Sequence, residues 1–232
     1  MFLFLGFLAI LCYHQCESSH YKVHIPLSAE NFYPRLKLNG TLPNMEEFTL
    51  CMWLRPYHFQ KEYSCFVSYS TNRLDHEIGG CFFNYSSKMN IGIEVLDVFN
   101  TFQCHQVNWY PGGWYHFCAS WFGSNGYIRV FINGNRCKLD DVGNDVAGNI
   151  EGGGIFVIGQ MQHGSDSGYV EDQAWHGDIV DINMWNEVLK DGQIREAYKC
   201  DGKRERGNII SGMKTSMTAL DVILSETELC KS

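Results

Sequence analysis

The sequence predicts an all-β fold, a two-sheet antiparallel sandwich of jelly-roll size that carries one helix. Apolar and polar residues alternate with a period of two along most of the chain, which is the spacing of strands. The strand-like runs are short, and turns rich in Gly and Asn separate them over about 200 residues, as in β-sandwiches. The total of 232 residues suits one such domain.

The alternation is clearest in residues 48–55, where Phe, Leu, Met and Leu occupy one face of the expected strand. Residues 127–132 alternate in the same way, and Asn133-Gly134 then provides a hairpin turn. Many other runs are apolar on both faces, as expected where sheets stack and other segments cover the outside. The remaining expected strands are residues 21–26, 65–69, 81–85, 91–95, 114–121, 155–159 and 179–185.

One helix is predicted over residues 189–198, where apolar residues recur near helical spacing. Asp191 is the candidate residue for capping its start, and Cys200-Asp201-Gly202 is expected to end it. The mixed-charge run 203–206 is expected to be a solvated loop.

The N-terminus predicts a secretory route. Residues 2–11 form an unbroken apolar run that is too short to span a bilayer and is typical of a signal peptide. We therefore expect a signal peptide over residues 1–18 and one mature domain over residues 19–232. No later segment reaches the roughly 18 apolar residues that a membrane span needs. The mature chain is expected to be secreted and extracellular.

Cleavage after residue 18 would leave eight cysteines in an oxidising compartment, where disulfides are expected. None of the eight lies in a Cys-x-x-Cys pair, and the spacing to histidines does not suit a zinc finger. Their spacing alone assigns no pairing. Two sequons, at Asn39 and Asn84, predict glycosylated, exposed turns. The mature cysteines are Cys51, Cys65, Cys81, Cys104, Cys118, Cys137, Cys200 and Cys230.

Charge and motifs argue against several function classes. The chain has 26 acidic and 18 basic residues, an excess that disfavours a general nucleic-acid or anionic-membrane surface. It has no Gly-x-Ser-x-Gly, His-Glu-x-x-His or phosphate-loop motif. A glycoside hydrolase would need two close carboxylates, and Glu94 and Asp97 are the nearest candidates. Their separation of three residues predicts opposite strand faces, so we expect that the chain is not an enzyme.

Two stretches carry a resemblance to a known family. His116-Phe117-Cys118-Ala119-Ser120-Trp121 is similar to the pentraxin pattern His-x-Cys-x-Ser/Thr-Trp-x-Ser/Thr, with Gly123 in place of the last hydroxyl residue. Ile158-Gly159-Gln160, and then Gly177-Asp178-Ile179 with Asn183-Met184-Trp185, resemble the pentraxin segment from the calcium loop to the strand before the helix. The similarity extends over nearly all of residues 20–228.

This resemblance, to proteins such as C-reactive protein and serum amyloid P component, implies a concanavalin-like jelly roll with one long helix on a face. It also implies an innate-immune type of recognition protein that binds a polyvalent ligand, such as a phospholipid headgroup, a glycan or a microbial surface. A cyclic homo-oligomer, for example a pentamer, would multiply weak sites into avidity. A laminin-G-like adhesion or structural module without metal is the alternative, and the motif at residues 116–121 favours the pentraxin interpretation.

The resemblance further implies one disulfide, because Cys51 and Cys118 match the family's inter-strand bridge. For the others, Cys65 and Cys81 flank an expected hairpin near Arg73 and could pair. Cys200 could then tie the helix end to Cys230, which leaves Cys104 with Cys137.

The resemblance implies calcium ligands, but the match is incomplete. Among the candidate positions, His76 stands where the family has Asn, and His163 stands where it has Asp. Met161 replaces an acidic ligand. Glu171 matches the Glu that binds the family's second calcium ion only if the alignment of this loop shifts by one residue. Since Ca²⁺ needs six to eight oxygen ligands, we expect weak Ca²⁺ binding. Imidazole with carboxylate suits Zn²⁺ better, which makes Zn²⁺ at Asp75, His76 and His163 an alternative to histidines without metal. The candidate metal ligands are Asp75, His76, Gln162, His163, Glu171 and Gln173.

Overall fold

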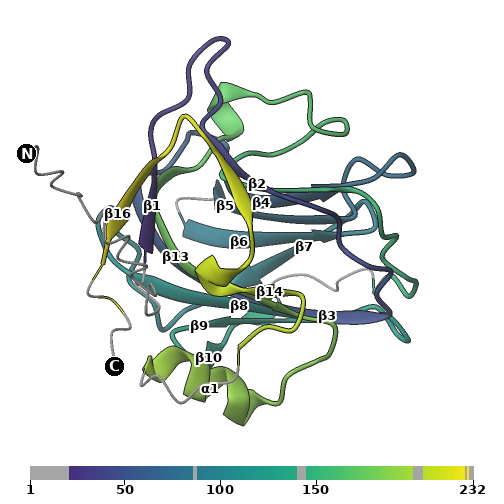
Figure 1. The fold of residues 1–232 in the computed structure, drawn as a ribbon. Coiled ribbons are helices and arrows are strands. Elements are labelled where there is room, and N and C mark those ends of the chain that lie inside the picture. The colour runs from purple at the N-terminus through teal and green to yellow at the C-terminus, as the bar shows by residue number, and fades with distance from the viewer. Residues whose placement is uncertain (1–20, 86–87, 140–144, 201–205, 228, 230–232) are drawn as a thin grey trace, which may run out of the picture.

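Two antiparallel sheets of eight strands each form a sandwich in the computed structural model (Figure 1). The structure describes residues 21–85, 88–139, 145–200, 206–227 and 229. The predicted signal peptide, residues 1–18, lies outside these residues. The two packed antiparallel sheets confirm the predicted fold class.

Sheet 1 has the order β10-β9-β8-β3-β13-β1-β16, and β14 also pairs with β13. Its long central strands, β3 and β13, coincide with two of the runs predicted from alternation. Its strands are β1 (Tyr21–Ile25), β3 (Glu47–His58), β8 (Tyr115–Phe122), β9 (Tyr127–Ile132), β10 (Asn135–Arg136), β13 (His176–Trp185), β14 (Ile210–Ser211) and β16 (Ile223–Glu226).

Sheet 2 has the order β11-β7-β6-β5-β4-β12-β2-β15. The four strands β4 to β7 form a meander, in which each strand pairs with the next along the chain. Its strands are β2 (Arg35–Leu38), β4 (Tyr63–Ser70), β5 (Ile78–Tyr85), β6 (Lys88–Val95), β7 (Val98–Gln103), β11 (Lys138–Leu139), β12 (Ile155–Ile158) and β15 (Met217–Leu220).

The hydrophobic core lies between the two sheets, where the predicted alternation places the apolar face of each strand. Phe48, at the start of the alternating run in β3, is 1% exposed. The ring of Phe66 on β4 lies 4.9 Å from the ring of Phe117 on β8, and this edge-to-face contact joins sheet 2 to sheet 1. The alternation predicted the core-facing side for Phe48, and the structure places Phe66 and Phe117 in the same core.

Helix α1 (Asp191–Lys199) lies on the outer face of sheet 1, below β8, β9 and β10 in Figure 1. Its nine residues are fewer than the long helix that the resemblance implied. Ile194 packs in a cluster with the outward-facing Phe131 and Trp185, and Tyr198 stacks on Trp53 with ring centres 5.7 Å apart. Two short 3-10 helices, η1 (Glu171–Gln173) and η2 (Gly212–Lys214), complete the elements.

The predicted cap of α1 is wrong by one residue. The N-cap is Lys190, whose extended backbone precedes the helix, and its N–H donates to the Gln193 side-chain oxygen at 2.8 Å. Asp191 is already helical. Its carboxylate accepts a hydrogen bond from Arg129 at 2.8 Å, and in the first turn it also complements the helix dipole. The C-terminal boundary agrees with the prediction, because Cys200 adopts the left-handed conformation that ends many helices.

Three of the four expected disulfides are confirmed. Cys51–Cys118 joins directly opposed residues of β3 and β8, and Cys65–Cys81 does the same for β4 and β5. Cys104–Cys137 is the third. Cys200 is also disulfide-bonded. Cys230 lies outside the described residues, so its pairing with Cys200 stays a prediction.

Both predicted glycosylation asparagines are exposed. Asn39 follows β2, where its amide donates to the Ser216 hydroxyl at 2.8 Å. The predicted turn at Asn84 is wrong, because Asn84 pairs with Met89 within strand β5. Their occupancy stays a prediction. Within the part of the chain that the structure describes, no helix has the length and apolar character needed to cross a membrane.

We expect Cys51→Ala with Cys118→Ala to lower the free energy of unfolding by more than Cys65→Ala with Cys81→Ala. The two bridges close separations of 67 and 16 residues, which correspond to about 4 and about 3 kcal/mol in the chain-entropy model. Both bridges are buried, so the two double variants are matched in the environment that they disturb. Denaturant unfolding followed by tryptophan fluorescence measures the difference, and the reverse order would contradict the argument.

Candidate ligand and metal site

The sequence-predicted site residues come from two loops that meet beside sheet 2. The β4–β5 turn carries Asp75 and His76, and the loop after β12 carries Gln162 and His163. The imidazole of His76 links them, because its Nε2 lies 3.0 Å from the backbone carbonyl oxygen of Gln162. The rings of His76 and His163 are 5.3 Å apart, so the two histidines do lie close together.

Two carboxylates that the sequence argument set aside also converge on His76. Its Nδ1 lies 3.2 Å from Glu94 Oε1 and 3.6 Å from Asp97 Oδ1. The expectation that Glu94 and Asp97 point to opposite sides is therefore wrong. Strand alternation ends at Val95, and the turn of Leu96 and Asp97, both with left-handed backbone, returns the Asp97 carboxylate to the side of Glu94.

Backbone contacts hold this arrangement in place. The N–H of Asp97 donates to the carbonyl of His76 at 3.0 Å, and the N–H of His76 donates to the Asp97 carboxylate at 3.2 Å. The N–H of Leu96 donates to the carbonyl of Glu77. The β6–β7 turn thus packs on the β4–β5 turn. This contact is what brings Glu94 and Asp97 to His76, and the sequence could have predicted it only if the pairing of the strands had been known.

The local charges favour the protonated form of His76. The hydrogen bond to the Glu94 carboxylate raises the pKa of His76 above its usual 6.5, and the charges of Glu94 and Asp97 and the Gln162 carbonyl add to this, against the opposing effect of burial. With hydrogen-bond acceptors facing both ring nitrogens, the imidazolium is the form that satisfies this site. In this form the ring donates to the Glu94 carboxylate and to the Gln162 carbonyl.

The side chain of Gln162 points into the protein. It is fully buried, and its amide nitrogen donates to the Ser68 hydroxyl at 3.1 Å and to the Ile155 carbonyl at 3.0 Å. Its side-chain oxygen accepts from the N–H of Asp166 at 2.9 Å. Of this residue, the structure therefore offers the backbone carbonyl rather than the amide to the site.

The other predicted ligands are more dispersed. Gln173 on η1 reaches the site, since its side-chain oxygen lies 2.7 Å from His163 Nε2. Asp75 and Glu171 are exposed, and their carboxylates make no hydrogen bond or ion pair within the described residues. Asp166, an acidic residue of the same loop, pairs with Lys37 and accepts the Tyr169 hydroxyl at 2.7 Å.

These positions do not fit Ca²⁺ as they lie. The Gln162 carbonyl already accepts from His76, Asp166 is taken by Lys37, and Met161 is buried against the Cys65–Cys81 bridge. The ligand atoms of His76, Glu94 and Asp97 all lie within 4.8 Å of one another. One nitrogen and two carboxylates suit Zn²⁺ better than Ca²⁺, which prefers six to eight oxygens.

Comparisons with known proteins identify the family. The model of the Pentaxin family matches residues 22–225. The chain belongs to the pentraxin family. It is 34% identical over 220 residues to C-reactive protein 1.4 of Limulus polyphemus, covering 90% of this chain and 86% of the relative. C-reactive protein 1.1 of the same animal is 31% identical over the same coverage.

The fold comparison agrees. The crystal structure of a native heptameric SAP-like pentraxin from Limulus polyphemus superimposes with a TM-score of 0.84 and 29% identity. The match covers 92% of this pentraxin and 98% of that chain. The family match supports the pentraxin interpretation and neither the laminin-G-like nor the glycoside-hydrolase alternative.

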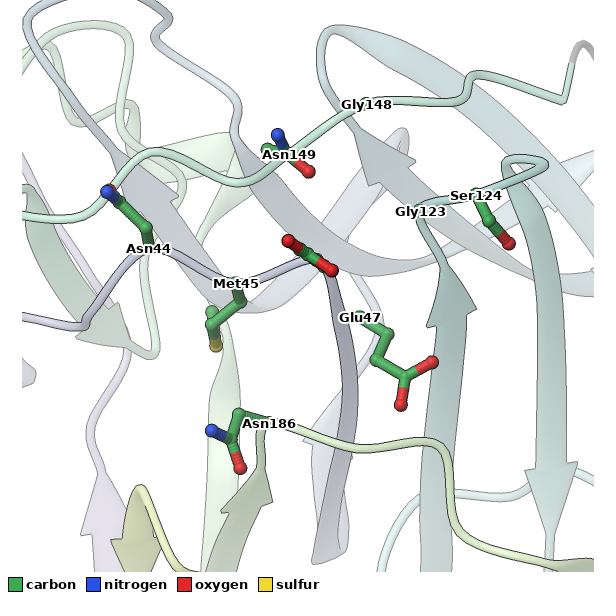
Figure 2. Close-up of a pocket in the computed structure, with 9 residues that line it drawn as sticks. Asn44, Met45, Glu47, Gly123, Ser124, Gly148, Asn149 and Asn186 are labelled. Atoms are coloured by element: carbon green, nitrogen blue, oxygen red, sulfur yellow. The ribbon is translucent and has the colours of Figure 1, made fainter.

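A separate polar cavity of about 740 Å³ lies near the ends of β3 and β8 (Figure 2). Asn44, Glu47, Asn149 and Asn186 surround it, and it shares no lining residue with the His76 cluster. Its walls come from segments far apart in the sequence, so no motif marks it. The side-chain oxygens of Asn44 and Asn186 are already bonded within the protein.

We expect His76→Gln to destabilise the fold more at about pH 5.5 than at about pH 8.5. The folded-state pKa of His76 is raised, so its contribution to stability is fully present below pH 6.5 and is lost as the pH rises through the folded-state value. Urea unfolding of both proteins at the two pH values measures this. The exposed His105 provides a control, because His105→Gln should show no such difference. An equal loss at both pH values would contradict a charged His76.

Proposed function

We propose that this pentraxin is a secreted recognition protein that binds a polyvalent extracellular ligand, a phospholipid headgroup or a glycan, through the face that carries the His76 cluster. The main support for the proposal is that the β4–β5 turn, the loop after β12 and the β6–β7 hairpin come together, through contacts of His76 with Glu94 and Gln162. Helix α1 lies on the other sheet, so it does not cover this face.

The polar groups of this face suit a small charged or hydroxylated ligand. Carboxylates of Asp75 and Glu171 are exposed, and the exposed His163 lies between His76 and Gln173. Next to Glu94 on β6, Phe99 is 39% exposed and its ring packs with those of Tyr63 and Phe83. Exposed aromatic rings beside carboxylates can take both a sugar face and a quaternary ammonium group.

A homo-oligomer follows as part of the proposal. The Limulus pentraxin that superimposes over nearly all of its own length is heptameric. A ring presents identical sites in one direction, so individually weak sites bind a repetitive surface with avidity. Light scattering on the purified protein should therefore give the mass of several chains, and a strict monomer at micromolar concentration would remove this part of the proposal.

The metal proposed for this face is Zn²⁺ rather than Ca²⁺. Zn²⁺ would replace the proton on Nδ1 of His76, which faces Glu94 and Asp97, while Nε2 keeps its contact with the Gln162 carbonyl. His163 and Gln173 lie beside them. Ca²⁺ at Asp75, Gln162, Glu171 and Gln173 would first require His76 to leave the Gln162 carbonyl. We therefore expect Ca²⁺ to bind more weakly here than Zn²⁺.

A thermal melt tests the choice of metal. The protein is melted with EDTA, with millimolar Ca²⁺ or with sub-millimolar Zn²⁺. A ligand at about 100 times its Kd adds about 2.7 kcal/mol, which is a shift of several degrees. We expect the Zn²⁺ shift to be smaller in His76→Ala with His163→Ala. A shift with Ca²⁺ that exceeds the Zn²⁺ shift would contradict the assignment.

Ligand binding is tested separately with vesicles that carry phosphocholine headgroups and with an immobilised polysaccharide. We expect His76→Gln to weaken binding to one of these surfaces, because it removes the charge that positions Glu94. His105→Gln, a change at another exposed histidine, should leave binding unchanged. Equal binding by both variants would contradict the assignment of the ligand face.

A further inference from the structure

The polar cavity near the ends of β3 and β8, which we call the strand-end cavity, lies outside the His76 cluster (Figure 2). Its volume of about 740 Å³ is within the range of small-ligand sites. Four separate segments line it, namely the start of β3, the β8–β9 turn, the approach to β12 and the end of β13. Their polar side chains are those of Asn44, Glu46, Glu47, Ser124, Asn149 and Asn186.

A second cavity extends the first one. It has a volume of about 390 Å³, shares Asn44, Glu46 and Asn149 with the strand-end cavity, and continues to Arg73 and Glu151. Because the two cavities have lining residues in common, they form one groove along this end of the sandwich, which we call the strand-end groove. A groove of this form accommodates an elongated ligand better than a compact one.

Backbone hydrogen bonds hold the floor of the groove in place. Met45 and Ile150 exchange both of their backbone hydrogen bonds, at 3.1 and 2.9 Å. The N–H of Gly123 donates to the Glu46 carbonyl, and the N–H of Gly148 donates to the Gly123 carbonyl, both at 2.9 Å. A Cβ on Gly123 would lie 2.0 Å from the Glu46 carbonyl oxygen, so only glycine permits this contact. The groove is therefore formed before a ligand binds, which lowers the entropic cost of binding.

Three amide side chains supply hydrogen-bond donors. The side-chain oxygen of Asn44 accepts the Gly152 N–H at 2.7 Å, and that of Asn186 accepts from the Asn208 amide at 2.6 Å. These bonds fix the orientation of both amides, and no group of the described residues accepts from their nitrogens. The amide of Asn149 makes no hydrogen bond within the same part of the chain, so it can both donate and accept.

Carboxylates supply the acceptors. Glu46 is exposed, and its carboxylate makes no hydrogen bond or ion pair among the residues that the structure describes. One oxygen of Glu47 accepts the Val188 N–H at 3.4 Å, and the other is open. The exposed hydroxyl of Ser124, on the side of the cavity opposite Asn44 in Figure 2, can take either role.

This lining disfavours anionic and apolar ligands. Glu46 and Glu47 repel an anion, and Arg73 cannot compensate, because it already pairs with Glu77 at 2.8 Å and with Glu151 at 3.0 Å. The apolar side chain in the strand-end cavity, Met45, is only 2% exposed and offers little surface. Amide N–H donors beside carboxylate acceptors also suit a simple cation poorly. Hydroxyl groups, which donate and accept at the same atom, match both.

We propose that the strand-end groove binds a neutral, polyhydroxylated chain, such as an uncharged oligosaccharide, by hydrogen bonds to Asn149, Glu46 and their neighbours. Among the described lining residues there is no aromatic ring, so the affinity of one site rests on hydrogen bonds and is weak. The groove is separate from the ligand face at His76, and the proposal does not depend on a metal ion.

Titration of the full chain with neutral oligosaccharides in the presence of EDTA tests the proposal. The probes are maltohexaose, chitohexaose and mannohexaose, and binding is followed by saturation-transfer NMR. We expect at least one of them to bind with a Kd in the millimolar range or tighter. Raising the salt concentration should leave this Kd unchanged, because the ligand carries no charge. If none of the three binds, the proposal is overturned.

Matched double variants locate the binding. We expect Asn149→Ala with Glu46→Ala to weaken oligosaccharide binding by about tenfold or more, since two hydrogen-bonding groups are lost. The control is Asn108→Ala with Glu30→Ala, an exposed amide and an exposed carboxylate elsewhere on the surface, and it should leave the Kd unchanged. All four side chains are exposed, so neither double variant should change the melting temperature of the free protein. Equal affinity of the two double variants would overturn the proposal.

Two single variants complete the test. Glu46→Gln keeps an acceptor oxygen and should bind the oligosaccharide within a few-fold of the parent protein. A loss as large as that of Glu46→Ala would indicate a cationic ligand and would overturn the proposal. His76→Gln should leave oligosaccharide binding unchanged, and the groove double variant should leave vesicle binding unchanged, so failure at one site is distinguishable from failure at the other.

Discussion

The cross-link between β3 and β8 determines how the two faces of the sandwich are used. Cys51 and Cys118 are directly opposed at the centre of sheet 1, and both are almost fully buried. On the outer face the bridge packs with Trp185 and Ile194, so it forms part of the surface on which α1 rests. On the inner face, neighbouring positions such as Leu50 belong to the core. The Cys51–Cys118 bridge therefore stabilises both the core and the surface on which α1 packs. The loops of sheet 2 form a separate surface.

On that surface, one histidine determines what the site can hold. In a cradle built for calcium, the backbone carbonyl and carboxylates would face a metal ion. Here the imidazole of His76 lies between the Gln162 carbonyl and the Glu94 carboxylate, and the hydrogen bond to Glu94 raises its pKa and so favours its protonated form. Acidic calcium ligands are replaced at Met161 and His163, and a basic side chain, His76, contacts the carbonyl of Gln162. Both changes make the site less negative.

His76 and His176 show how neighbouring groups determine the protonation of the same type of side chain. His76 faces two carboxylates, which raise its pKa, whereas His176 is buried near two other histidines, which lower its pKa. The first environment favours the protonated imidazole, and the second favours the neutral imidazole.

The sequence by itself determined the fold class, the central strands and the helix, because alternation and turn residues are local signals, but it did not predict β2, β7, β10, β11 or β14 to β16. The resemblance at residues 116–121 indicated the family and the Cys51–Cys118 bridge. The Cys65–Cys81 and Cys104–Cys137 pairs, which cysteine spacing does not assign, were hypotheses that the structure confirms. The sequence also identified His76, Gln162, His163 and Gln173, which lie together in the structure. Only the tertiary structure decided that Glu94 and Asp97 join His76, since a left-handed turn reverses the strand alternation. It also decided that His24 and His176 lie close together, with ring centres 6.1 Å apart, because sheet register, which no local pattern encodes, pairs β1 with β13.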